Sequence, residues 1–410
     1  MSKNLQLAAM LLALCPVAMA QVEPAATGPS VPLPAGKYDY SIRYAQTAEF
    51  GQSLGNWQTG AVSGSLNYSN GRERLPFSMN YGGGYNFTIA GPSYGKGLFQ
   101  HLDLTQSVTG KEWNLTMGND VSYTPEAPTL GFTGIPGIGE PVTTPTPPIV
   151  TQSILTLNTL VLDNSSNATI ERQLNYAWNM NLGGSYNLLR FPDGNGLDSG
   201  TAGATGGLSY RLSARDSLMG NYRFSKFTYP RFGFSFYTQT VFFGFQRVWT
   251  KKVSTDVTVG PQWTSSSSPS LVPSTQGVAV NAALTYRAGY NSFSTSYSRG
   301  INGGGGYLIG AESDTASANY SRLIDRALTL GFNAAYMRTA GLVNNGITGA
   351  KYGGAEATRR LGPYLSVFAN YSLIDQSSSS LLPGNALGKR LQVVGFGLSY
   401  SPRQKEQPAQ

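Results

Sequence analysis

Apolar and polar side chains alternate with a period of two along most of this chain. In residues 328–336 (LTLGFNAAY), one face carries Leu, Leu, Phe, Ala and Tyr, and the other carries Thr, Gly, Asn and Ala. Residues 278–286, 365–371 and 62–68 alternate in the same way. Successive side chains of a β-strand point to opposite faces. These segments therefore predict strands with one apolar and one polar face.

Strand length and composition separate two all-β architectures. A two-sheet sandwich also alternates, but its core needs large side chains on both inner faces, and its strands are usually about 5–6 residues long. Many segments here continue toward the roughly 9–11 residues of a membrane strand. Charged residues make up only 12% of the chain, beside 24 Tyr and 18 Phe, whereas typical domains carry roughly 25% charge. We predict an all-β fold, a closed antiparallel transmembrane β-barrel.

Turn spacing predicts the number of strands. Short turns such as Ser213–Asp216 alternate with longer Gly/Ser/Pro-rich loops such as residues 300–310. Short periplasmic turns and long extracellular loops are the usual asymmetry of outer-membrane barrels. Between residues 37 and 401 the pattern yields about 18 strands (16–18). An even number places both ends of the barrel on the periplasmic side.

The two ends of the chain differ from the barrel segment. Residues 1–20 have a Lys near the start, an apolar run and the small residues Ala18-Met19-Ala20, which predicts a cleaved signal peptide. The apolar run is too short to span a bilayer, which needs about 20 residues. A Pro-rich periplasmic segment is expected at residues 21–36 and a polar tail at residues 402–410. Cleavage would remove Cys15, the single cysteine, so we expect no disulfide.

Charged residues within the strands are candidate pore-lining residues. A charge on the lipid face costs roughly 2–4 kcal/mol near the midplane, which favours the water-facing side, where charges tune ion selectivity. The alternative is that each charge merely solvates the wall. Acids outnumber arginines in this set, so we expect weak cation preference or near neutrality despite the formal charge of +8. The predicted pore-lining residues are Asp39, Arg43, Asp103, Asp120, Glu171, Arg223, Asp256 and Arg287.

In architecture the chain resembles bacterial outer-membrane porins, although no motif in it identifies a characterised subfamily. Its last strand alternates through Val394–Tyr400, similar to the C-terminal signature that the barrel-assembly machinery reads. The resemblance implies a bacterial outer-membrane location, with outer-membrane lipid and the assembly machinery as partners and small solutes as cargo. The oligomeric state stays open.

Residues 124–161 form an unusually long Pro/Gly/Thr-rich connection, the third extracellular loop, and its charged residues are Glu126 and Glu140. A connection of this length is usually functional or disordered. In general porins the third loop folds inward and narrows the pore, so the resemblance implies that Glu126 and Glu140 belong to a constriction. A surface-exposed loop is the alternative.

Chemical motifs for other functions are missing. The single histidine, His101, shares a strand face with Asp103, but no partner motif accompanies the pair, so we expect no enzyme activity. With one His and one Cys we expect no metal site and no cofactor. No basic helix or aromatic–basic motif points to nucleic acid. The remaining function is a channel for passive or weakly selective diffusion of ions and small polar solutes. The alternative is a structural or secretion-associated barrel, for example one serving exopolysaccharide export or surface attachment.

Overall fold

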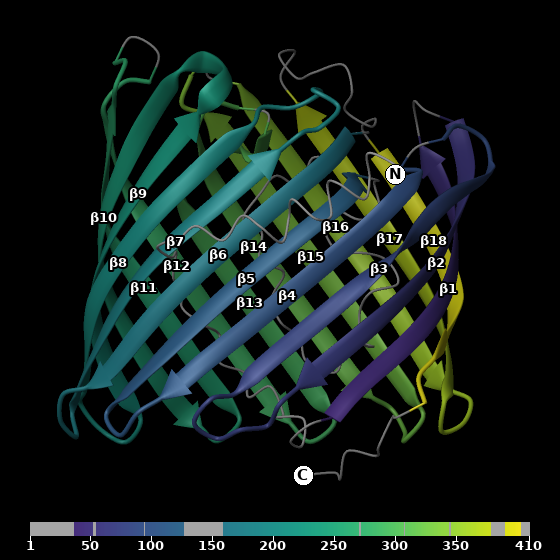
Figure 1. Cartoon of the computed structure of the whole chain (residues 1–410), viewed down its shortest axis with the longest axis horizontal. Coiled ribbons are helices and arrows are strands. Elements are labelled where there is room, and N and C mark those ends of the chain that lie inside the picture. The colour runs from purple at the N-terminus through teal and green to yellow at the C-terminus, as the bar shows by residue number, and fades with distance from the viewer. Residues whose placement is uncertain are drawn as a thin grey trace.

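The computed structural model describes residues 37–51, 55–93, 95–126, 159–269, 272–306, 308–343, 346–378 and 390–402. These residues form one antiparallel sheet of 18 strands, in which each strand pairs with its neighbours in sequence (Figure 1). Pairing of the first strand with the last closes the sheet into a barrel. The strands are β1 (Lys37–Gly51), β2 (Gly55–Ser69), β3 (Phe77–Ala90), β4 (Gly97–Thr109), β5 (Trp113–Glu126), β6 (Thr159–Gln173), β7 (Trp178–Arg190), β8 (Ser199–Arg211), β9 (Asp216–Tyr229), β10 (Phe234–Thr250), β11 (Val253–Ser266), β12 (Thr275–Ala288), β13 (Asn291–Asn302), β14 (Ala311–Leu323), β15 (Leu328–Gly341), β16 (Ile347–Arg360), β17 (Leu365–Ser378) and β18 (Arg390–Tyr400). Two short 3₁₀ turns lie at Pro230–Phe232 and Gly304–Gly306. Within the described ranges, neither these turns nor any other helix has the length and apolarity to cross a membrane.

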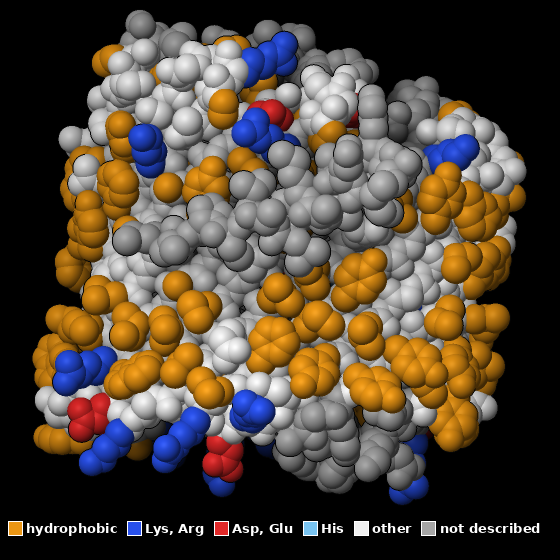
Figure 2. Space-filling view, in the orientation of Figure 1, with side chains coloured by type: hydrophobic (Ala, Val, Ile, Leu, Met, Phe, Trp, Pro, Cys, Tyr) orange, Lys and Arg blue, Asp and Glu red, His pale blue; other side chains and the backbone are white. Residues whose placement is uncertain are grey.

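The outer face of the barrel is apolar because alternation in each strand is kept in register with its neighbours. In β1 the side chains of Tyr40, Ile42 and Tyr44 are exposed, whereas Ala45, of opposite parity, is buried. Residues opposite one another in an antiparallel pair share a face, and Tyr44 lies opposite Val62 on β2 and Leu398 on β18. The apolar face therefore continues around the ring. Figure 2 shows such side chains gathered in a band over the lower part of one face.

This apolar band indicates that the barrel is surrounded by lipid. An apolar surface that surrounds the whole molecule far exceeds the few hundred Å² of a typical soluble monomer. In a bilayer the same side chains contact lipid, and closure leaves no unpaired strand edge in the hydrocarbon. The barrel therefore spans a membrane, and its strands are the spanning elements.

Turn chemistry distinguishes the two ends of the barrel. One end, the short-turn edge, carries tight turns such as residues 251–252, 289–290 and 324–327; the other, the long-loop edge, carries longer connections such as 191–198 and 303–310. β1 begins and β18 ends at the short-turn edge, as Ile42 pairs with Tyr400. Lys and Arg side chains line the short-turn rim in Figure 2.

A single carboxylate organises the β14–β15 turn. The backbone N–H groups of Ala327 and Leu328 donate to Asp325 Oδ1 at 2.6 and 2.8 Å. These two hydrogen bonds hold the pKa of Asp325 below its ordinary value. Asx turns of this kind reverse the chain within a few residues, which keeps this edge compact.

The strand count is confirmed, but the limits expected for the long third loop were wrong. β5 continues to Glu126 and β6 begins at Thr159, so both ends of the expected 124–161 loop belong to strands, and Glu126 ends a strand instead of lying in the loop. Pro125 pairs with Leu160 on β6, whereas on the β4 side pairing stops at Tyr123. Proline is tolerated there because it needs no backbone donor at an unpaired strand end. Residues 127–158, with Glu140, lie outside the described residues, as do the expected signal peptide, the 21–36 segment and residues 403–410.

Candidate functional site

The wall of the lumen holds all eight candidate pore-lining residues. Each has at least one outward-facing apolar neighbour in its strand; Arg43, for example, stands between Ile42 and Tyr44. The register carries this face from strand to strand, pairing Arg43 with Ser63 and Asp103 with Asp120. Position along the strands then divides the eight into two groups. The mid-strand group is Arg43, Asp103, Asp120 and Arg223; the group nearer the short-turn edge is Asp39, Glu171, Asp256 and Arg287.

An acidic patch lies at mid-strand on β4–β6. Asp103 and Asp120 are direct register partners, and His101 Nε2 lies 3.4 Å from Asp120 Oδ2. Asp163, on β6, accepts a hydrogen bond from Asn187 Nδ2 at 2.7 Å, and Asp103 accepts one from Thr105 Oγ1 at 3.3 Å. Carboxylates this close together produce a negative potential that attracts cations. From the sequence, Asp103 on the same strand was the expected neighbour of His101. In the barrel the His101 side chain lies beside Asp120 on the next strand.

One arginine stands on each side of this acidic patch. The Arg43 guanidinium carbon lies 3.5 Å from the centroid of the Phe368 ring, and that of Arg223 lies 5.3 Å from the Phe242 ring. Contacts of this kind hold a guanidinium along the wall. β1 and β9 each stand four strands from β5 in the ring. The mid-strand lumen therefore presents one acidic sector between two basic positions.

Sequence reasoning missed several inward-facing charges. The alternation pattern contained the signal, but short or small neighbours, such as the alanines beside Glu356, made the faces hard to distinguish. With the eight candidates, the missed residues bring the total to eight carboxylates and five arginines on inward positions, counted over the strand residues whose side chains the structure describes. The missed residues are Glu49, Asp163, Glu356, Arg211 and Arg360.

Glu49 is the most buried of these carboxylates, with 2% of its surface exposed. Thr47 Oγ1 and Thr59 Oγ1 donate to its Oε1 at 2.9 and 3.0 Å. It lies toward the long-loop edge, away from the acidic patch. Within the described residues, the Glu49 carboxylate therefore links β1 to β2 through these two threonines.

Two apolar patches interrupt the polar wall. The first comprises Phe227, Tyr229, Phe234 and Phe236 on β9 and β10, packed with Val272. The second runs across β15–β18 and β2 and comprises Trp57, Ala335, Met337, Ala350, Tyr352, Ile374, Leu391 and Val393. In a ring of 18 strands, β10 and β18 stand eight strands apart, close to half the circumference. The two patches thus lie on nearly facing walls.

The β13–β14 loop (303–310) lies against the first apolar patch. The Tyr229 hydroxyl donates to Gly303 O and accepts from Gly310 N–H, both at 2.8 Å. Farther along, Leu197 N–H in the β7–β8 loop donates to Gly306 O at 2.8 Å. Residues 303–306 and 308–310 of this loop therefore connect β13 with Tyr229 on the inner face of β9 and with the β7–β8 loop. Positive φ at Gly304 is the local property that permits this path.

Asp193 ties the β7–β8 loop to the start of β6. Its carboxylate accepts hydrogen bonds from Thr159 Oγ1 at 2.7 Å and from the Leu160 N–H at 3.0 Å, and two further ones from Asn195. Burial alone would raise the pKa of Asp193, but these hydrogen bonds outweigh it and hold the pKa below its ordinary value. The long-loop mouth is thus ordered by polar contacts as well as by the aromatic patch.

The closed sheet, the apolar outer band and the polar, charged interior together decide the class of protein, because such barrels occur in outer membranes. This chain is a transmembrane β-barrel of the outer-membrane type. No protein-family model matches it, and no curated protein matches it. Within the described residues, no group of three or more His, Cys, Asp or Glu side chains could hold a metal ion.

Solved outer-membrane barrels are similar to the chain in fold. Pseudomonas aeruginosa OccK5 (OpdH) is 13% identical with a TM-score of 0.47, covering 90% of this chain and 98% of that one. P. aeruginosa OccK2 (OpdF), solved in complex with glucuronate, is 12% identical with a TM-score of 0.48 (89% and 97% coverage). Acinetobacter baumannii OccAB4 is 9% identical with a TM-score of 0.47 (90% and 98% coverage). These likenesses concern the fold alone.

Proposed function

We propose that this barrel is a channel for passive or weakly selective diffusion of ions and small polar solutes across the outer membrane, with a weak preference for cations. The observation that carries the proposal is the excess of inward carboxylates over inward arginines in a chain whose formal charge is +8. The basic excess lies instead in turns, loops and outward positions. The proposal assigns the chain no enzymatic reaction.

Wall charges outweigh mouth charges in setting selectivity. Charges at the rim are screened within about 8 Å at physiological ionic strength, whereas low-dielectric walls focus the field of charges inside the lumen. Asp103 and Asp120 lie at mid-strand, where every permeating ion passes them. A unit charge about 10 Å from an ion in water contributes about 0.4 kcal/mol, or about a twofold change in ion partition.

The test is the reversal potential of single channels in planar bilayers under a salt gradient. Wild-type protein should be weakly cation-selective. Removing the Asp120 carboxylate lowers cation partition about twofold and raises anion partition about twofold, so Asp120→Asn should lower the cation-to-anion permeability ratio by about fourfold at low ionic strength. Asp216→Asn is the matched control: it removes one carboxylate from an outward position of β9, where Asp216 lies 3.5 Å from Arg247 Nε. This control should leave the reversal potential unchanged.

Two results would count against the proposal. A clearly anion-selective wild-type channel, or equal shifts in both variants, would show that the acidic patch does not control permeation. A correctly folded barrel without measurable conductance would instead favour the structural or secretion-associated alternative.

A further inference from the structure

A row of charged side chains of both signs follows the outer face of β13–β18 near the long-loop edge. Arg299 Nη2 lies 2.9 Å from Glu312 Oε1, and its Nη1 lies 3.6 Å from Asp314 Oδ1. Arg338 Nη1 lies 3.8 Å from the other oxygen of Asp314. The register continues the row onto the next strands. With Arg299, Glu312, Asp314 and Arg338, the row comprises Lys351, Asp375 and Arg390.

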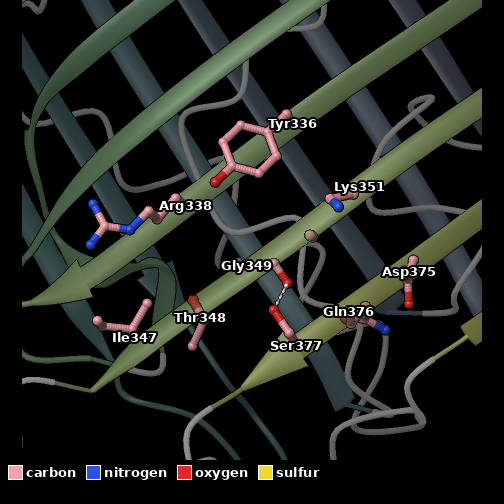
Figure 3. Close-up of a pocket in the computed structure, with 10 residues that line it drawn as sticks. Tyr336, Arg338, Ile347, Thr348, Gly349, Lys351, Asp375, Gln376 and Ser377 are labelled. Atoms are coloured by element: carbon pink, nitrogen blue, oxygen red, sulfur yellow. Dashed lines mark hydrogen bonds between the residues drawn. The ribbon is translucent and has the colours of Figure 1, made fainter.

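An open pocket of about 320 Å³ indents this row between β15, β16 and β17 (Figure 3). Gly349 lies at its floor, opposite Arg338 on β15 and Ser377 on β17. Ser377 Oγ donates to Gly349 O at 3.4 Å, and a Cβ at Gly349 would stand 2.9 Å from that hydroxyl. Figure 3 shows Tyr336 and Lys351 on neighbouring strands beside this floor. The depression thus exists because a glycine stands between two cationic side chains.

The two cations that line the pocket keep hydrogen-bond donors available. The Arg338 side chain is 48% exposed, and its one ion pair with a described residue, Asp314, is long at 3.8 Å. Asp314 is shared, since it also lies near Arg299 and accepts a hydrogen bond from Tyr297 at 2.8 Å. For Lys351, no carboxylate of the described residues comes within 4.0 Å of the ammonium nitrogen. The row holds four bases and three acids, which leaves one positive charge uncompensated.

The pocket lies at the level where the outer apolar band ends. On the side toward the short turns, the same strands expose Tyr336, Phe332 and Tyr371. On the other side lie the strand ends and the long loops. In outer-membrane barrels the long loops are extracellular, and aromatic and basic side chains mark the interfacial layer. The pocket therefore lies level with the headgroups of the outer leaflet.

We propose that this outward pocket binds a phosphate group of an outer-leaflet lipid. Arg338 supplies the planar fork of donors that suits phosphate, and Lys351 adds a second cation from the adjacent strand. Tyr336 and Ile347 provide apolar contact for the part of the lipid next to the phosphate. The uncompensated positive charge of the row matches an anionic headgroup. The acyl chains of the same lipid contact the apolar band on the side toward the short turns.

The test measures lipid binding to the full-length, detergent-solubilised barrel by native mass spectrometry. The probes are diphosphorylated lipid A, chemically dephosphorylated lipid A, and inorganic phosphate alone. Wild-type protein should retain diphosphorylated lipid A, and the Arg338→Gln/Lys351→Gln variant should bind it about tenfold or more weakly. The matched control is Arg322→Gln/Arg359→Gln, which removes two outward bases at the short-turn edge of β14 and β16, on either side of β15, and should bind as wild type does.

Three outcomes would overturn the proposal. Equal losses in the test and control variants would indicate general adsorption to basic side chains. Equal retention of dephosphorylated lipid A would show that the phosphate is not recognised. Displacement of the lipid by millimolar inorganic phosphate would assign the pocket to the free anion. Heat-modifiable migration of each variant verifies that the barrel has folded, so a folding defect is distinguished from lost binding.

Discussion

Replacing Tyr229 by Phe tests how the β13–β14 loop is held against the inner wall. Tyr229 has 0% of its surface exposed, and its hydroxyl joins Gly303 O and Gly310 N–H at 2.8 Å each. The ring also stacks against Phe234 and Phe236, with centroids 6.1 and 6.2 Å away. Phenylalanine retains these ring contacts. The substitution therefore removes two hydrogen bonds and little else.

The size of the effect follows from burial of the two loop groups. Leaving a buried donor or acceptor without its partner costs about 1–3 kcal/mol. The Gly310 N–H is buried and takes this full cost, whereas the Gly303 carbonyl is only partly buried and should cost about 1 kcal/mol. We therefore expect the attachment of the loop to weaken by about 2–4 kcal/mol. Since about 1.4 kcal/mol corresponds to a factor of ten, the detached population of the loop should rise by about 30- to 700-fold.

Hydrogen exchange of residues 303–310, followed by mass spectrometry, measures this population directly, because local opening controls exchange of protected amides. The matched control is Tyr222→Phe on the same strand. Tyr222 faces outward, and its hydroxyl donates to Gln239 at 3.1 Å in an exposed position. Loop exchange in this control should equal that of wild type. If Tyr229→Phe also exchanged like wild type, the loop would be held by other contacts, and the reasoning would be wrong.

Two further predictions concern the wall and the long-loop mouth. Gly84→Ala should lower the free energy of unfolding in urea by about 1–3 kcal/mol, because a Cβ there would overlap the Val62 carbonyl oxygen. Gly353→Ala is the control, since the space around that site is open, and it should be neutral or stabilising. Equal effects of the two substitutions would refute the steric argument. The lowered pKa of Asp193 means that its stabilisation is present above the ordinary carboxyl pKa of about 3.9 and is lost as pH falls through the folded-state value. Asp193→Asn should weaken the contact with Thr159 at neutral pH and flatten the acid dependence of exchange in the β7–β8 loop, and an unchanged pH profile would contradict this.

The architecture could be predicted from the sequence because alternation is a local property. Each strand needs only the period-two geometry of an extended backbone, and lipid on one side and water on the other repeat that pattern around the ring. The strand count and the closed barrel followed. The limits of the third loop did not, because Pro125 reads as loop in the sequence, whereas its pairing with Leu160 depends on β6.

The candidate site was predictable only in part, for the same reason. The alternation within each strand placed Asp103 and Asp120 on the inner face. Which side chains meet in the lumen, however, depends on the register between strands. That register sets His101 beside Asp120, a contact that sequence proximity to Asp103 conceals. Glu356 was missed because its alanine neighbours give a weak contrast between faces.

The sequence by itself determined which side chains alternate, and therefore the fold class, the outward apolar band and the acidic bias of the inner wall. These follow from backbone geometry and from the cost of placing charge in hydrocarbon. The tertiary structure alone decided which residues meet. Tyr229 reaches Gly303, 74 residues away, and Gly349 leaves a pocket between two cations from different strands. Such contacts depend on strand register and loop path, which are set by the closed sheet as a whole because no local pattern encodes the pairing of distant segments.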